Sequence, residues 1–180
     1  MKLMIASDLH GSYHYAKKMA ALYERTGAAR LVLLGDLLYH GPRNDLPEGY
    51  APMDVAALLN EMKHELLCVR GNCDADVDQM VLQFPITAES VILYLKGRMV
   101  FATHGDVFHA DHPPLIGGKD VLLHGHTHIS AAVDTGRYIY LNPGSIALPK
   151  DGHHSYMLYE NGVFQVRELS GEMLQEWNIA

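Results

Sequence analysis

The chain has 180 residues, of which 48% are hydrophobic, and a formal charge of −7. This length and composition predict one globular domain, residues 1–180, and exclude a disordered protein. No apolar stretch approaches the roughly 20 residues that cross a bilayer, so we expect no membrane partner. No run of lysine or arginine forms a basic patch, so we expect no nucleic-acid partner.

The first half of the chain alternates between strand and helix patterns. Buried strands are predicted at 2–6, 30–34 and 66–70, and amphipathic helices at 12–25 and 52–64. This alternation is typical of a parallel sheet with crossover helices. The Pro/Gly-rich segment 41–51 is interpreted either as a solvated surface loop or as a lid that faces the substrate.

The second half is rich in short β runs separated by turn signals such as Asn161-Gly162. A short helical piece is predicted near 75–83, and the tail GEMLQEW is predicted as a short surface helix. The whole pattern predicts an α/β fold in which two mixed β-sheets pack face to face, flanked by helices on the outside.

The two cysteines, Cys68 and Cys73, lie five positions apart and form no disulfide framework. Cys68 falls inside an expected strand and is interpreted as a small buried hydrophobic residue. The few residues ahead of Asp8 are too short for a signal peptide. We therefore expect a reducing, cytoplasmic location.

Polar blocks follow five of the apolar runs. Strand ends in an α/β sheet are where loops converge and ligands bind. These blocks would bring enough carboxylate, imidazole and amide donors to one edge to hold two divalent cations. The blocks are Asp8-Leu9-His10, Gly35-Asp36, Gly71-Asn72-Cys73-Asp74, His104-Gly105-Asp106 and Gly125-His126-Thr127-His128.

Each block taken alone also has an ordinary structural explanation. Asp8 suits a helix cap, Asn72 suits an Asx turn, and a pair such as His126 and His128 also occurs on exposed strands. The joint order of the blocks is the informative signal. Asp36, with two carboxylate oxygens, is the residue best suited to bridge two cations.

The order D-x-H, G-D, G-N-x-[DE], H-G, G-H-T-H resembles the calcineurin-like metallophosphoesterase family from Asp8 to His128. The small size, the G-N-C-D variant and the segment Asn142-Pro143-Gly144-Ser145 resemble its YfcE-like group of small bacterial phosphodiesterases. The resemblance implies an α/β/β/α sandwich. It also implies one metal held by Asp8, His10, Asp36 and His128, and a second held by Asp36, Asn72, His104 and His126.

This donor set contains no thiolate and suits Mn²⁺ best, with Fe, Zn²⁺ or Mg²⁺ as alternatives. Two such ions share a water and supply hydroxide near neutral pH, which would attack a small phosphodiester. The alternatives are a phosphomonoesterase of the same fold and a non-catalytic interaction scaffold, like the retromer subunit that shares this fold. A homo-oligomer is left open.

The catalytic residues are expected to include Asn72, Cys73, Asp74 and His104. Many family members carry a histidine where this chain has Cys73, and that histidine can protonate the leaving group while the next acid orients it. Because a thiol is a poor acid near pH 7, the identity of the general acid is open.

Candidate substrate contacts are His40, Arg43 and His109, each with a surface or structural role as the alternative. His112 is a further general-acid candidate, and Arg70 is a further phosphate contact or ion-pair partner. His124 ends a strand behind the expected ligands. His14, His64, His153 and His154 are interpreted as solvated surface residues.

Overall fold

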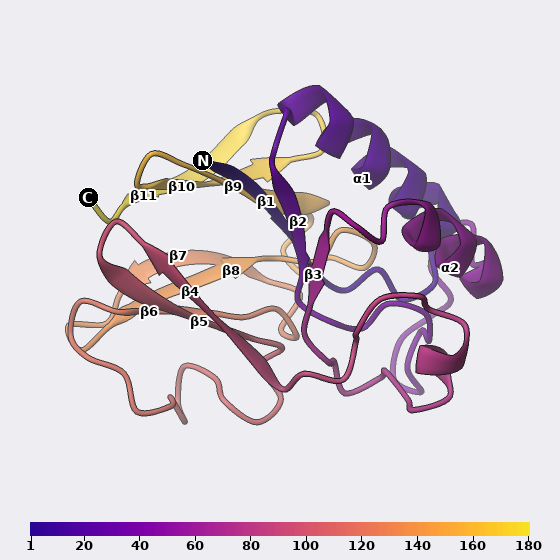
Figure 1. Cartoon of the computed structure of the whole chain (residues 1–180), viewed down its shortest axis with the longest axis horizontal. Coiled ribbons are helices and arrows are strands. Elements are labelled where there is room, and N and C mark those ends of the chain that lie inside the picture. The colour runs from indigo at the N-terminus through magenta and orange to yellow at the C-terminus, as the bar shows by residue number, and fades with distance from the viewer.

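The computed structural model describes residues 1–180 as two β-sheets and two helices (Figure 1). The first sheet has six strands in the order β11-β10-β9-β1-β2-β3. Their bounds are β1 Lys2–Ala6, β2 Arg30–Leu33, β3 Leu66–Cys68, β9 Ser155–Glu160, β10 Val163–Glu168 and β11 Met173–Asn178. As predicted, β1, β2 and β3 run parallel, whereas β9, β10 and β11 add antiparallel pairs at one side.

Two helices cover one face of this sheet (Figure 1). In α1 (Tyr13–Thr26) the Ser12 hydroxyl accepts the Tyr15 N–H at 3.3 Å, and Gly27 ends the helix with a φ of 64°. Pro52 begins α2 (Pro52–Glu61), where its missing N–H removes no helical bond. Neither helix is long and apolar enough to span a membrane.

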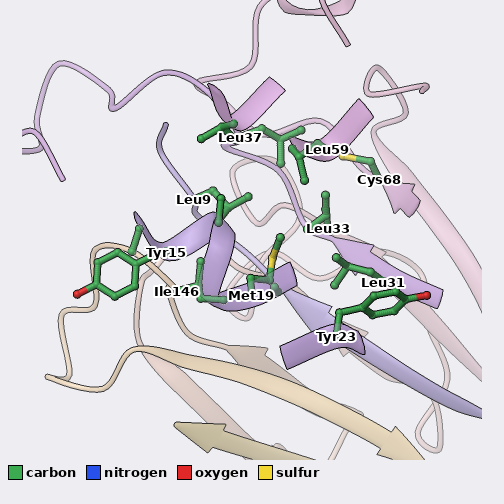
Figure 2. Packing of buried hydrophobic residues seen from close by; sticks show 14 of the residues in the cluster. Leu9, Tyr15, Met19, Tyr23, Leu31, Leu33, Leu37, Leu59, Cys68 and Ile146 are labelled. Carbon is green, nitrogen blue, oxygen red and sulfur yellow. The ribbon is translucent and has the colours of Figure 1, made fainter. Parts of the chain in front are cut away.

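Between these helices and the sheet lies a cluster of 23 buried hydrophobic residues. Figure 2 shows Met19 of α1 near Leu31 and Leu33 of β2, with Leu59 of α2 near Cys68. Cys68 is 5% exposed and belongs to this cluster, so its interpretation as a buried hydrophobic residue is confirmed.

The second sheet has five strands in the order β4-β5-β6-β8-β7. Their bounds are β4 Ser90–Leu95, β5 Arg98–Thr103, β6 Val121–Leu123, β7 Ser130–Asp134 and β8 Ile139–Pro143. A second cluster of 17 buried residues fills the space between the sheets, with Ile5 and Val32 from one side and Val100, Leu123 and Leu141 from the other. The expected face-to-face packing of two mixed sheets is confirmed.

Helices flank this sandwich on one side only, so the second helical layer of the expected α/β/β/α order is missing (Figure 1). On the outer face of the second sheet, Phe108 packs edge-on against Phe101, with ring centroids 5.6 Å apart. The connection from β5 to β6 carries Pro113-Pro114 and Gly117-Gly118, which disfavour a helix there.

The expected helix in the tail is wrong, because those residues form the edge strand β11 paired with β10. Leu174 and Trp177 have the i, i+3 spacing of a helix, yet both pack from this strand against the inter-sheet core. The helical piece near 75–83 is reduced to one 3₁₀ turn, η1 (Asp78–Met80).

Candidate metal centre

The loops that follow β1, β2, β3, β5 and β6 meet at one edge of the sandwich. Backbone hydrogen bonds join neighbouring loops there: the His10 N–H donates to the Asp36 carbonyl at 2.9 Å, and the Gly125 N–H donates to the His104 carbonyl at 2.8 Å. Since these strands are parallel within each sheet, all five loops lie at the same end.

The first group of donors gathers around Asp8. Its Oδ1 atom lies 3.3 Å from His128 Nε2 and 3.7 Å from His10 Nε2. The two histidine Nε2 atoms lie 3.1 Å apart. His10 Nε2 is also 3.6 Å from Asp36 Oδ2, which brings a second carboxylate to this group.

The second group gathers around His104. Its Nε2 atom lies 3.0 Å from Asn72 Oδ1, 3.1 Å from His126 Nδ1 and 3.5 Å from Asp36 Oδ2. The same oxygen of Asp36 therefore faces both groups. All seven candidate ligands are brought together around two adjoining positions. Because Asp36 belongs to both groups, each position has four ligands.

This arrangement fits a pair of divalent cations. With metal–ligand bonds of about 2.0–2.2 Å, neighbouring ligand atoms lie about 3–3.5 Å apart. Asp8 Oδ1 is buried without a hydrogen-bond partner, which is costly for a carboxylate oxygen unless a cation compensates it. Asp8, His10 and His128 form one potential metal group, and Asp8, Asp36 and His104 form another.

Three of the histidines are held in one orientation from behind. In each, Nδ1 donates to a backbone carbonyl, which leaves the Nε2 atom facing the centre. The contacts are His10 to Tyr39 at 2.9 Å, His104 to Leu34 at 2.7 Å and His128 to Leu148 at 2.6 Å. Carbonyl support of this kind is typical of metal-ligating histidines.

The backbone around the centre is strained. Five of the seven candidate ligands have a positive φ, which non-glycine residues rarely adopt. They are Asp8 (59°), His10 (47°), Asp36 (56°), His126 (64°) and His128 (60°). Such conformations cost of order 1–3 kcal/mol each and concentrate at functional sites.

A model of the calcineurin-like phosphoesterase superfamily domain matches residues 1–161 of the chain. The chain belongs to the calcineurin-like phosphoesterase superfamily. It is 47% identical to phosphodiesterase YfcE of Escherichia coli K12, over 97% of this chain and 95% of that protein. As a member of this family of metal-using hydrolases, the chain is an enzyme.

Solved structures agree with this assignment. The structure of YfcE, a phosphoesterase from E. coli, superimposes with a TM-score of 0.97 at 45% identity and covers 100% of both chains. Vps29 of Entamoeba histolytica in complex with Zn²⁺ matches with a TM-score of 0.62 at 18% identity, over 100% of both chains. The second likeness shows a shared fold alone.

Glycines let the loops of this phosphoesterase centre approach one another. A Cβ atom on Gly125 would overlap Ser7 Oγ and would lie 2.8 Å from Asp8 Oδ2. A Cβ atom on Gly71 would overlap the Asp36 carboxylate. Both glycines are therefore required by space next to a carboxylate of the centre.

We expect Gly125→Ala to displace Asp8 and to weaken metal binding by about 10–100-fold, the usual cost of disturbing the support of a ligand. The measurement is the dissociation constant for Mn²⁺ together with the thermal unfolding midpoint. Gly118→Ala is the matched control, because its nearest neighbour would lie at an ordinary 3.5 Å. An unchanged metal affinity in Gly125→Ala would show that Asp8 does not need this space.

The charges of the centre favour the ligand forms of two carboxylates and two imidazoles, but not the neutral form of His104. Burial alone raises the pKa of Asp8 and Asp36, but contacts with histidines outweigh burial and lower both. Burial lowers the pKa of His10 and His126, which keeps these rings neutral at pH 7. Burial also opposes the charged form of His104, but the Asp36 and Asp8 carboxylates outweigh it and raise its pKa to about 9.

Asp74 supports the loops of the centre. Its carboxylate accepts the backbone N–H groups of Asp36 at 2.9 Å, Leu37 at 2.8 Å and Gly71 at 2.7 Å. Burial is the main reason why its pKa is raised to about 6. Both of its oxygens bind backbone N–H groups, and the expected role of Asp74 beside a general acid stays a prediction.

Cys73 faces the centre as a thiol. Its backbone N–H donates to Asp36 Oδ1 at 2.8 Å, and the Asn72 amide donates to its sulfur at 3.3 Å. Burial and then the Asp36 carboxylate raise the pKa of Cys73 to about 12. The sulfur lies within 4.8 Å of a potential ligand atom of His10 and of Asp36, but at neutral pH it is protonated and is a poor metal ligand.

A cavity of about 370 Å³ opens onto the centre. Its walls include the segment 41–44 and Lys150, whose position was not predicted, as well as the candidate ligands. Of the candidate substrate contacts, Arg43 lines this cavity, whereas His40 and His109 do not.

The other histidines have structural surroundings. His40 packs edge-on against Tyr50, and His109 exchanges backbone hydrogen bonds with His112. His124 is buried behind Gly105 and stacks on a tyrosine ring. His154, expected to be solvated, is half-buried with its Nε2 atom 2.9 Å from the Tyr15 hydroxyl.

Proposed function

We propose that this enzyme is a dinuclear metal-dependent phosphodiesterase that hydrolyses a small phosphodiester. The observation that carries the proposal is the position of Asp36 Oδ2, which faces His10 at 3.6 Å and His104 at 3.5 Å. One metal would be held by Asp8, His10, Asp36 and His128, and the other by Asp36, Asn72, His104 and His126.

When bound, two divalent ions supply a nucleophile from water near neutral pH and offset the charge that develops on the phosphoryl oxygens. The chain supplies fixed positions for the ions. Carbonyls behind His10, His104 and His128 hold the imidazoles, and Asp74 holds the loop of Asp36. Little reorganisation is then needed during the reaction.

The group that lies nearest the leaving oxygen would be Cys73, which lines the cavity beside Asn72. A thiol with a pKa of about 12 donates a proton poorly at pH 7. Diesters whose leaving groups depart as stable anions are therefore the favoured substrates. The name of the 47% identical relative, a phosphodiesterase, supports the same choice.

Hydrolysis of bis(4-nitrophenyl) phosphate and of 4-nitrophenyl phosphate tests this function. We expect the diester to be the better substrate, activity to disappear after a chelator, and Mn²⁺ to restore it better than Mg²⁺, Zn²⁺ or Fe²⁺. A clear monoester preference would favour the phosphomonoesterase. Protein that holds two metals and hydrolyses neither compound would favour the interaction scaffold.

The preference for Mn²⁺ rests on the donor set of carboxylates, imidazoles and one amide oxygen, with no thiolate at neutral pH. A cytoplasmic location is proposed from the cysteine usage, since both cysteines are free.

Metal binding is expected to release protons. Without metal, His104 has a pKa of about 9 and is protonated at pH 7.5, whereas a metal ligand must be neutral. Apparent affinity should therefore rise by up to about tenfold per pH unit between pH 7 and 9 and then level off. Calorimetric titration with Mn²⁺ in buffers of different ionisation enthalpy measures the released protons. An affinity independent of pH over this range would contradict the role of His104.

A further inference from the structure

Two cavities meet at the proposed metal centre. The first, of about 370 Å³, opens between the segment 41–44 and Lys150, and the second, of about 350 Å³, opens toward Phe108. The only residue that lines both is Asn72. A phosphodiester has two ester arms on one phosphorus atom, so a phosphate held beside Asn72 can direct one arm into each cavity.

The first cavity carries unpaired positive charge. Arg43 and Lys150 both line it, and neither side chain takes part in an ion pair. The one carboxylate in its lining is Asp36, whose oxygens already face the Cys73 N–H and the histidines. Cys73 is its only hydrophobic lining residue, so the cavity suits a polar or charged group.

Arg43 and Lys150 lie on segments that are hydrogen-bonded to residues next to the centre. The Lys150 N–H donates to the carbonyl of His128 at 2.9 Å. The Asn44 amide, one residue after Arg43, donates to the His40 carbonyl at 2.8 Å. The positions from which the two side chains reach are thus fixed relative to the donors.

The second cavity has the opposite character. Its arginine, Arg70, is paired with Asp76 at 3.2 Å, and the carboxylates of Asp74, Glu89 and Asp106 lie in its walls. An anion would be repelled there, whereas an uncharged arm can pack against Phe108.

We propose that the substrate is an asymmetric phosphodiester in which one ester arm carries a second anionic group, bound by Arg43 and Lys150 in the first cavity. This inference rests on the proposed phosphodiesterase function. Arginine offers a forked donor that matches phosphate, sulfonate or carboxylate oxygens, and lysine adds a point charge. Against a formal charge of −7 for the whole chain, this local positive charge selects a small anion at the site.

The test compares two dialkyl diesters, methyl propyl phosphate and methyl 3-sulfopropyl phosphate. The sulfonate carries the charge but is a weak metal ligand. Calorimetric titration into Mn²⁺-loaded protein should give a dissociation constant about tenfold or more lower for the sulfonate compound. In the double variant Arg43→Gln/Lys150→Gln the two constants should become equal within about twofold.

The matched control is Arg25→Gln/Lys18→Gln, which removes the same charge from a depression beside α1, away from the centre. This control should keep the wild-type ratio. Equal constants in the wild type, a ratio that survives in Arg43→Gln/Lys150→Gln, or an equal loss in the control would each overturn the inference. Hydrolysis of bis(4-nitrophenyl) phosphate, measured on the same protein, reports separately whether the phosphodiesterase function itself holds.

Discussion

Replacing Asp36 with asparagine should reduce diester hydrolysis by about 10³-fold or more. This loss is larger than the roughly 10–100-fold loss of metal affinity or activity that follows when a residue hydrogen-bonded to a metal ligand is replaced. Asp36 Oδ1 accepts the Cys73 N–H, so the amide oxygen of the variant would take that position. Its NH₂ group would then face His10 and His104 in place of a charged oxygen. One substitution removes a ligand and a negative charge from both metal positions.

The measurement is kcat/KM with bis(4-nitrophenyl) phosphate at saturating Mn²⁺, with metal content determined on the same sample. Asp54→Asn is the matched control, because Asp54 is an exposed carboxylate in the first turn of α2. Near-normal turnover in Asp36→Asn would exclude the shared-carboxylate arrangement.

Substitution of Cys73 should have the second-largest effect, in the direction of higher activity. Cys73→Ala should change rates by less than about threefold, because the thiol supplies little proton transfer. Cys73→His should raise kcat for diesters and monoesters with poor leaving groups by about 10²-fold, at the low end of the range for general acid catalysis. The low end is expected because Asp74 is bound to backbone N–H groups and because Gly41 lies close to the Cys73 sulfur.

Cys73→Gln is the matched control, since it fills the space without an acidic proton. Steady-state kinetics on a series of aryl esters with leaving groups of increasing pKa separates the effects, provided metal content is measured alongside. A gain in Cys73→Gln equal to that in Cys73→His would refute the general-acid explanation. An inactive but fully metallated Cys73→Ala would show a direct role for the thiol.

The positions of the seven candidate ligands could be predicted because each follows an apolar strand closely in the sequence. The parallel direction of β1, β2 and β3 then places those strand ends at one edge. Backbone strain was not visible in the pattern, since the positive φ of Asp8 or His126 depends on contacts between loops far apart in the chain.

Residues outside those blocks were harder to place. Asp74 accepts hydrogen bonds from Asp36 and Leu37 of another loop, which no local pattern shows. Lys150 reaches the cavity because its backbone binds the His128 carbonyl. The edge strand β11 was mistaken for a helix because Leu174 and Trp177 have helical i, i+3 spacing. They reach the same core from a strand only because its pairing with β10 shifts register at Leu174, and the sequence does not show that shift.

The most direct test of a dinuclear centre is an anomalous difference map from crystals of the Mn²⁺-loaded protein. We expect two peaks about 3.5–4 Å apart, one among Asp8, His10 and His128 and the other among Asn72, His104 and His126, with Asp36 Oδ2 between them. A single peak, or two peaks without Asp36 as a shared ligand, would contradict the proposed centre.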